Sequence, residues 1–155
     1  MAKVFNVNGA CRPSRHYMVD IRRKLEEIKT MVDAGDYFAI NRARQYGKTT
    51  TLRALSGYLK EDYEVVSLDF QRMSSLSFES EQAFVAAFSD ELLDFVEKFP
   101  AEVEERLKEF VDKTARINSL QALFRVLRLW CRESEKPIVL MIDEVDTATN
   151  NQVFL

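Results

Sequence analysis

The chain has 155 residues, of which 46% are hydrophobic and 30% are charged, and its formal net charge is −3. With only four glycines and three prolines, it is neither collagen-like nor a low-complexity disordered chain, and it has the composition of a soluble globular domain. The longest purely aliphatic run, IVLMI at 138–142, is too short to span a membrane. The N-terminus shows no basic region followed by an apolar one, which favours a cytoplasmic protein.

Charge is distributed unevenly along the chain. Residues 1–60 carry 12 Lys and Arg against 5 Asp and Glu, whereas residues 61–155 carry 10 against 20. The basic first part could bind the phosphates of a nucleotide or of nucleic acid, although the two parts could instead neutralise each other on packing. No nucleic-acid recognition motif supports the nucleic-acid alternative. Cys11 and Cys131 lack the spacing of a metal or redox motif, and Cys131 is predicted to be a small core residue.

The spacing of hydrophobic residues predicts helices that alternate with strands. Helices are expected over residues 19–35, 48–60, 79–98, 101–113 and 119–136. Buried strands are expected over residues 37–41 (YFAIN), 64–70 (EVVSLDF) and 137–144 (PIVLMIDE). This alternation predicts an α/β fold with a mainly parallel sheet.

Several residues are expected to end the helices or to face the core. Gly35 fits the position just after a helix, Pro100 should end the helix over 79–98, and Asn118 with Gln121 resembles a variant capping box. The acid-rich residues of 101–113 are interpreted as a solvated face. The predicted inward-facing residues of the other helices are Ile21, Leu25, Ile28, Val32, Leu52, Leu55, Leu59, Phe84, Phe88, Leu92, Phe95, Phe99, Leu120, Leu123, Leu127 and Trp130.

Residues 42–49, RARQYGKT, end in the letters of a phosphate-binding loop. The general signature G-x-x-x-x-G-K-[ST] requires a glycine at the position of Arg42. The segment follows a predicted strand and opens a predicted helix, and there backbone N–H groups and a helix N-terminus can face an anion. Gly47 could adopt a positive φ, Lys48 would contact the β and γ phosphates, and the Thr49 hydroxyl would bind Mg²⁺. The alternative is an ordinary strand-to-helix turn with solvated arginines.

The strand IVLMIDE supplies the acidic partner that a phosphate loop needs. Its aliphatic residues predict a strand buried on both faces, with Asp143 at the carboxyl end, where open α/β sheets place their ligands. Asp143 is therefore predicted to bind Mg²⁺, and Glu144 to position or activate a water molecule. Alternatively, Asp143 merely caps the segment that follows.

Four blocks of the chain, FNVNGACRPSRHYMVDI, YFAINRARQYGKTTTL, VVSLDFQ and VLMIDEVD, resemble the AAA-ATPase-like family of bacterial proteins. That family has NR-x-R-x-x-GK[TS] in place of the standard loop, and DE(V/I)D at the acidic strand, so Arg42 matches the family's own variant. The resemblance implies a P-loop NTPase-type three-layer αβα fold, with Lys48 and Glu144 catalytic and with Thr49 and Asp143 as metal ligands. The residues expected to contact the nucleotide are Arg44, Gln45, Tyr46, Gly47, Lys48, Thr49 and Thr50.

Members of that family are usually longer, with further strands, a sensor residue, a completing arginine and often a nuclease-like C-terminal domain. We therefore expect residues 1–155 to form one P-loop ATPase-like domain, truncated at its C-terminus and with an incomplete sheet. It would comprise an N-terminal segment and helix over 1–35 and a nucleotide-binding core over 36–155. The implied partners are a nucleoside triphosphate and a downstream effector domain or a second copy of the chain.

The function predicted from the sequence is ATP binding and Mg²⁺-dependent hydrolysis that powers or switches downstream domains. One alternative is a nucleotide-sensing interaction module with negligible turnover. Another is a small-molecule kinase, since phosphate loops serve both purposes. Glu144 directly after Asp143 favours activation of water over transfer to a second substrate.

Overall fold

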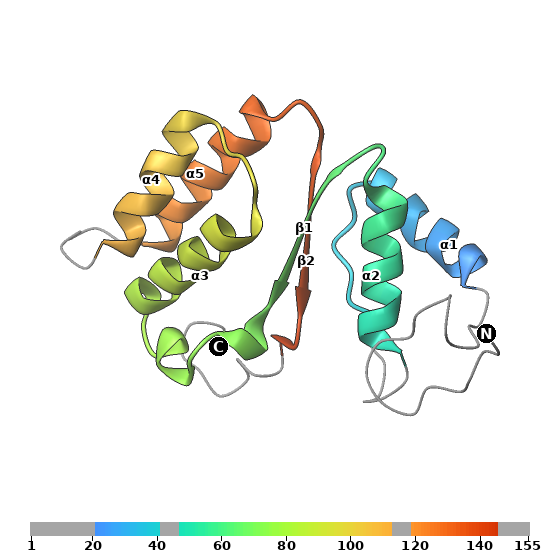
Figure 1. Cartoon of the computed structure of the whole chain (residues 1–155), viewed down its shortest axis with the longest axis horizontal. Helices are drawn as coiled ribbons and strands as arrows, with labels where there is room; N and C mark the ends of the chain where they lie inside the picture. Colours follow the sequence, from blue (N-terminus) through green and yellow to red (C-terminus); the bar gives the residue numbers. More distant parts are fainter. Residues whose placement is uncertain (1–20, 41–46, 113–118, 146–155) are drawn as a thin grey trace, which may run out of the picture. The chain divides into compact units, whose positions relative to one another are not determined.

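Figure 1 shows the computed structural model of the chain, which describes residues 21–40, 47–112 and 119–145. The chain divides into a first unit, residues 1–62, and a second unit, residues 63–155, and each is described by itself. The first unit contains α1 (Arg22–Asp33) and α2 (Lys48–Leu59). The second contains β1 (Glu64–Asp69), η1 (Phe70–Arg72), η2 (Ser75–Phe78), α3 (Glu81–Phe95), α4 (Ala101–Val111), α5 (Leu120–Glu133) and β2 (Ile138–Asp143).

The predicted helix over 19–35 is confirmed, and Gly35 ends it as expected. Gly35 has a φ of 74°, a left-handed conformation that a glycine adopts without steric penalty. Its N–H donates to the carbonyl of Val32 at 2.9 Å, and the N–H of Asp36 donates to the carbonyl of Met31 at 3.0 Å. This pair of bonds is the Schellman arrangement, which satisfies carbonyls that a helix end would otherwise leave unpaired.

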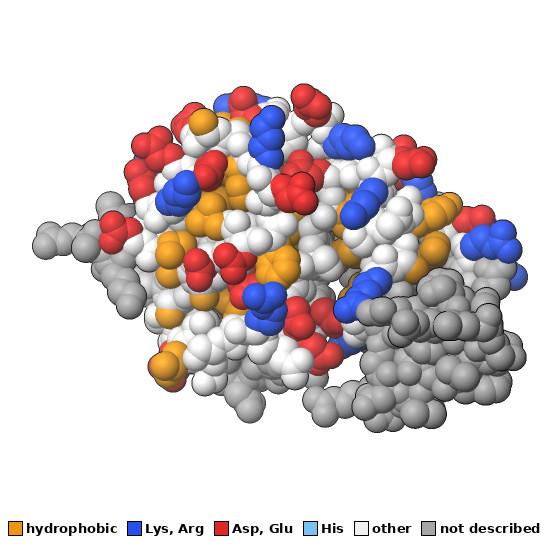
Figure 2. All heavy atoms as spheres, viewed as in Figure 1, with side chains coloured by type: hydrophobic (Ala, Val, Ile, Leu, Met, Phe, Trp, Pro, Cys, Tyr) orange, Lys and Arg blue, Asp and Glu red, His pale blue; other side chains and the backbone are white. Residues whose placement is uncertain are grey.

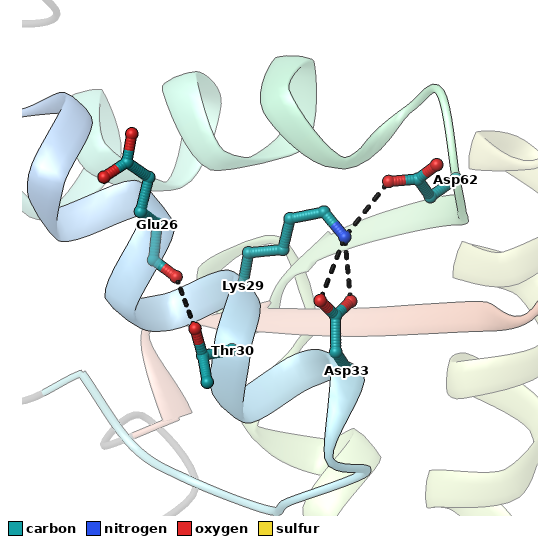
Figure 3. A network of polar contacts seen from close by, with 5 residues as sticks. All are labelled: Glu26, Lys29, Thr30, Asp33 and Asp62. Carbon is teal, nitrogen blue, oxygen red and sulfur yellow. Dashed lines mark hydrogen bonds and ion pairs between the residues drawn. The ribbon is translucent and has the colours of Figure 1, made fainter.

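An ion-pair network joins α1 to the residues that follow α2, as Figure 3 shows. The ammonium of Lys29 lies 2.8 Å from an oxygen of Asp33 and 3.0 Å from an oxygen of Asp62. Hydrogen bonds to Asp33 and then to Asp62 raise the pKa of Lys29 above its usual value. Lys29 therefore stays charged across the physiological range. Because the side chains of Asp33 and Asp62 are 49% and 58% exposed, these ion pairs add little to the stability of the fold.

The predicted strand over 37–41 is wrong for its described part. Residues 36–40 form no regular secondary structure, and Asn41 lies outside the described residues. The side chain of Tyr37 is fully exposed and that of Phe38 is 39% exposed. A strand exists only through hydrogen bonds to a neighbouring strand, so apolar composition alone does not create one.

The two other predicted strands are confirmed within one residue at each end and form a parallel pair. The prediction that the strand over 137–144 is buried on both faces is wrong, because Leu140 is 41% exposed and Met141 is the one described residue of β2 that is buried. The register of the pair runs from Glu64 beside Ile138 to Asp69 beside Asp143. The N–H of Glu64 also donates to the carbonyl of Pro137 at 2.9 Å, which extends the pairing by one bond. Parallel strands require a long crossover connection, and here α3, α4 and α5 form it. The chain is therefore a mixed α/β protein, as predicted.

The core of the second unit lies between one face of this sheet and the three helices, which Figure 1 shows on one side of the strands. Phe70 contacts the rings of Phe78, Phe84 and Phe88 at centroid distances of 5.6–6.5 Å. The buried residues of this core are Val66, Leu68, Phe70, Phe78, Phe84, Val85, Phe88, Leu92, Phe99, Val103, Leu107, Phe110, Leu123, Val126 and Trp130. The three-layer arrangement stays a prediction, because the described helices of the second unit lie on one side of the sheet only.

Helix boundaries differ from the predictions by up to about three residues, and two residues expected to mark helix ends have other positions. α3 ends at Phe95, and Pro100 precedes the first residue of α4 instead of ending α3. Proline is tolerated at this N-cap position because a helix start leaves that N–H without a partner inside the helix, and proline has no N–H. The N-cap of α5 is Ser119, whose hydroxyl accepts from Ala122 N–H at 3.2 Å. Asn118, the predicted cap, lies outside the described residues.

Two side chains face differently from the prediction. Cys131 is exposed, although its neighbour Trp130 is buried as predicted, 4.8 Å from the ring of Phe99. Successive residues of a helix are turned by about 100°, so burial of one residue does not imply burial of the next. Phe95 is 41% exposed because α3 ends there, at the rim of the core.

The acid-rich face of α4 is exposed, as predicted. Val103, Leu107 and Phe110 point into the core, whereas Glu102, Glu105 and other charged residues face solvent. Figure 2 shows acidic side chains in red interspersed with Lys and Arg in blue over this part of the second unit. None of the helices in the described ranges is long and apolar enough to cross a membrane.

Candidate functional site

The phosphate-loop half of the predicted site lies at the start of α2 in the first unit. Gly47 occupies the N-cap position with φ 77° and ψ 24°, the left-handed conformation that favours glycine. A Cβ atom at this position would meet no atom within 4 Å, so conformation rather than space selects the glycine. The helix begins at Lys48, as the loop pattern predicts. Arg42, Arg44, Gln45 and Tyr46 lie outside the described residues.

The first turn of α2 has the properties of an anion-binding helix start. The carbonyl of Gly47 accepts from the N–H of Thr51 at 2.8 Å and from its hydroxyl at 2.9 Å, which fixes the turn. Glycine has no side chain to cap the N–H groups, and the first turn contains no acidic residue. No acidic residue of this turn therefore offsets the partial positive charge of the helix N-terminus, which favours an anion. Thr49 is exposed and Lys48 and Thr50 are partly buried there.

The acidic half of the site lies at the carboxyl end of β2 in the second unit. Asp143 is the last residue of the strand, and its Oδ1 accepts from the N–H of Glu144 at 2.9 Å. Both residues are partly buried. This local bond orients the carboxylate at the carboxyl end of the strand, which is the end of the sheet where open α/β proteins bind their ligands. Asp143 therefore occupies the position that the sequence predicts for it.

Glu144 has an unusual backbone conformation. Its φ is 55°, and it is the only described non-glycine residue with a positive φ. A left-handed conformation costs a residue with a side chain about 1–2 kcal/mol, and such strain is concentrated at functional sites. The predicted water-activating residue thus coincides with the strained position of the described chain. No sequence pattern signals this strain, since glutamate has no preference for a positive φ.

The structure adds a carboxylate that the sequence reasoning did not assign. Asp69 ends β1 and pairs in register with Asp143, so two acidic residues lie side by side at the same edge. Asp69 Oδ1 accepts from the N–H of Gln71 at 2.9 Å and thereby caps η1. The signal was present in the sequence, because both EVVSLD and IVLMID end an apolar run with Asp and parallel strands end at the same edge.

The two halves of the predicted site lie in different units, and the structure describes each unit by itself. Gly47, Lys48 and Thr49 are brought together on one helical turn, and Asp143 and Glu144 at one strand end. The convergence of these two groups on one ligand stays a prediction. In the described ranges, no group of three or more His, Cys, Asp or Glu side chains is placed to hold a metal ion.

A family model described as an AAA-like domain matches residues 10–154, which include both halves of the predicted site. A search of curated proteins and a search of solved structures gave no match.

Proposed function

Because the chain belongs to the AAA-like domain family, we propose that it binds ATP together with Mg²⁺ and hydrolyses it. One observation supports this proposal above the others. The helix that starts at Lys48 opens from a left-handed Gly47, with no side-chain cap and no acidic residue in its first turn. Such a helix start favours a phosphate group both electrostatically and through its N–H groups.

The residues present suit a nucleotide-bound Mg²⁺ ion. Mg²⁺ prefers hard oxygen ligands, and it commonly uses one or two protein groups together with phosphate oxygens and water. The Thr49 hydroxyl and the Asp143 carboxylate are oxygen ligands of this kind, at a helix start and a strand end. A dedicated cage of several carboxylates is unnecessary for such an ion. When bound, Mg²⁺ would supply positive charge that offsets the charge of the phosphates.

Lys48 and Glu144 would have separate roles in hydrolysis. The ammonium of Lys48 would neutralise charge that develops on the phosphate oxygens, as cations do in phosphoryl transfer. Glu144 would accept a hydrogen bond from water and hold it for attack. The bond from Glu144 N–H to Asp143 fixes the backbone from which that side chain projects. The energy released would act on a downstream domain or on a second copy of the chain.

Binding is tested by the melting temperature with and without Mg-ATP. At a hundredfold excess over Kd, a ligand stabilises the folded state by about 2.7 kcal/mol, which should raise the melting temperature by about 5–10 °C. Lys48→Ala should remove most of this shift. Lys24→Ala on α1 is the matched control, because Lys24 is also partly buried but lies outside the predicted site. A shift that survives Lys48→Ala unchanged would contradict the loop assignment.

Hydrolysis is tested separately by phosphate release. Glu144→Gln should keep the Mg-ATP shift and lower the release rate by at least about 100-fold, as for loss of a general base. Glu105→Gln, an exposed change on α4, should leave both properties unchanged. If wild type binds Mg-ATP but releases no phosphate, the protein is a nucleotide-sensing module instead. Transfer of the phosphate to an added small molecule would identify a kinase.

A further inference from the structure

The solvent-facing side of α5 in the second unit carries arginines and no acidic residue. Arg125, Arg128 and Arg132 are all exposed, and residues 121–132 contain no Asp or Glu. Residues three, four and seven positions apart lie on the same side of a helix, so these arginines form one stripe. With a rise of about 1.5 Å per residue, the stripe is about 10 Å long.

An aromatic ring lies on the same side of α5. Phe124 is 55% exposed, and it precedes Arg128 by four residues, which is about one helical turn. The opposite side of the helix is the buried one, where Leu123, Val126 and Trp130 pack into the core. More than half of the Phe124 side chain is therefore accessible to another molecule. We call Phe124 and the three arginines together the arginine face.

The contacts within the described ranges engage these guanidinium groups only weakly. Arg128 Nε donates to the carbonyl of Phe124 at 3.4 Å, and the four other N–H groups of this guanidinium take no part in that bond. Arg132 Nε lies 3.4 Å from Oε1 of Glu133, in a pair whose side chains are 75% and 50% exposed. Exposed ion pairs of this kind contribute little. Arg125 forms no ion pair with another described residue.

The exposed ring indicates which kind of anion fits the arginine face. A guanidinium group can donate two parallel hydrogen bonds to a phosphate or to a carboxylate, so arginines alone do not distinguish the two. Sites for single-stranded nucleic acid combine such cations with aromatic side chains on which the bases stack. An acidic peptide has no bases to stack on the ring. A lipid surface requires a broad apolar helix face, whereas α5 buries its apolar face in the core.

We propose that the arginine face binds single-stranded nucleic acid, with its arginines on successive phosphates and Phe124 stacked on a base. The stripe of about 10 Å matches about three nucleotides of a stacked strand, taken at about 3.4 Å each. Phosphates and the faces of bases carry little sequence information, so binding should depend only weakly on sequence. Residues 61–155 carry an excess of acidic residues. Salt screens exposed charges beyond about 8 Å, so the local charge of the arginine face governs the contact.

The experiment measures the fluorescence anisotropy of a labelled oligodeoxythymidine, titrated with the 155-residue chain at several salt concentrations. The logarithm of the association constant should fall linearly with the logarithm of the salt concentration, with a slope of about −2 if three phosphates of a single strand are neutralised. Arg128→Gln should reduce the magnitude of this slope by about 0.7. Phe124→Ala should weaken binding by at least about fivefold and leave the slope unchanged, because it removes stacking and no charge.

Two control variants separate the arginine face from other cationic sites. Arg106→Gln is the matched control, since Arg106 is a 54% exposed arginine on α4, and it should leave the slope unchanged. Lys48→Ala should bind the oligonucleotide like wild type, because the phosphate loop is not part of the arginine face. If Lys48→Ala abolishes oligonucleotide binding, the strand binds at the phosphate loop and this inference is wrong. The proposed ATP binding is measured separately, so either proposal can fail without the other.

Several results would overturn the inference. Wild type that binds no oligonucleotide at low salt, or an unchanged slope in Arg128→Gln, would exclude the arginines as the contact. A duplex bound as tightly as the single strand, or polyglutamate that competes equally well, would exclude stacking on Phe124. Self-association that Arg128→Gln abolishes would show that a second copy occupies this face instead. Should either variant fail to fold, Arg125→Gln and Phe124→Leu replace them, with the same expected effects on the slope and on the affinity.

Discussion

Glu144 combines a strained backbone with a proposed chemical role, and the two can be separated by a glycine substitution. Glu144→Gly should raise the free energy of unfolding by up to about 1 kcal/mol, since it relieves a left-handed conformation but adds entropy to the unfolded chain. Phosphate release should be lost in the same variant. Stability is measured by urea unfolding, with release assayed on the same preparation.

The control for this substitution should change the free energy of unfolding in the opposite direction. Glu105 lies exposed inside α4, so Glu105→Gly should lower the free energy of unfolding by about 0.5–1 kcal/mol. Glu105→Gly should also leave phosphate release intact. Equal destabilisation by Glu144→Gly and Glu105→Gly would contradict this prediction. It would mean that the contacts of the Glu144 side chain stabilise the fold by more than its positive φ destabilises it.

Single residues were predictable where one local rule determines them. Gly35 and Gly47 both have the positive φ that their positions after and before a helix suggested. Cys131 was not predictable in this way, because its exposure depends on the side of α5 that meets the core. Asp69 lies beside the predicted site only through its register with Asp143, a contact between positions far apart in the chain.

At the level of elements, α5 depends on a cap from another helix. The carboxylate of Glu81, in the first turn of α3, accepts from the N–H of Leu120 at 2.6 Å. Glu81→Ala should lower the free energy of unfolding by about 1–2 kcal/mol, because it removes a charged acceptor from a helix N-terminus. Glu81→Gln, which retains an amide oxygen, should lose about half as much. Equilibrium unfolding in urea measures both.

Gln82 provides the control for this cap. It is exposed and lies next to Glu81 on α3, so Gln82→Ala should change the free energy of unfolding by less than about 0.5 kcal/mol. Equal destabilisation by Glu81→Ala and Gln82→Ala would show that the first turn of α3 matters and that the bond to Leu120 does not.

The sequence predicted the elements that depend on local patterns and missed those that depend on contacts between distant residues. The helices were predicted because their apolar spacing reports one-sided burial, and α4 shows this with Val103, Leu107 and Phe110 inward. The segment over 37–41 has the composition of a strand, but its described part, residues 37–40, shows no strand pairing. The Glu81 cap was also missed, because it joins residues 39 positions apart.

For the whole molecule, the decisive question is whether the two units act on one ligand. The family match over residues 10–154 spans both units, so the family assignment does not depend on either unit alone. The predicted site also draws its residues from both units, since Lys48 belongs to the first unit and Asp143 to the second. Sequence motifs predicted the members of each half. That the two halves converge on one ligand stays a prediction, because convergence depends on tertiary structure, which no local pattern encodes.

Hydrogen exchange measured with increasing Mg-ATP tests that convergence. The first N–H groups of α2 have no acceptor within the helix, and a bound phosphate would slow their exchange. Exchange should also slow around Asp143 and Glu144, and both effects should reach half their size at the same Mg-ATP concentration because one ligand causes them. Peptides from α4 should be unaffected. Protection confined to the first unit, or two different half-saturation points, would show that the phosphate loop and the acidic strand do not share a nucleotide.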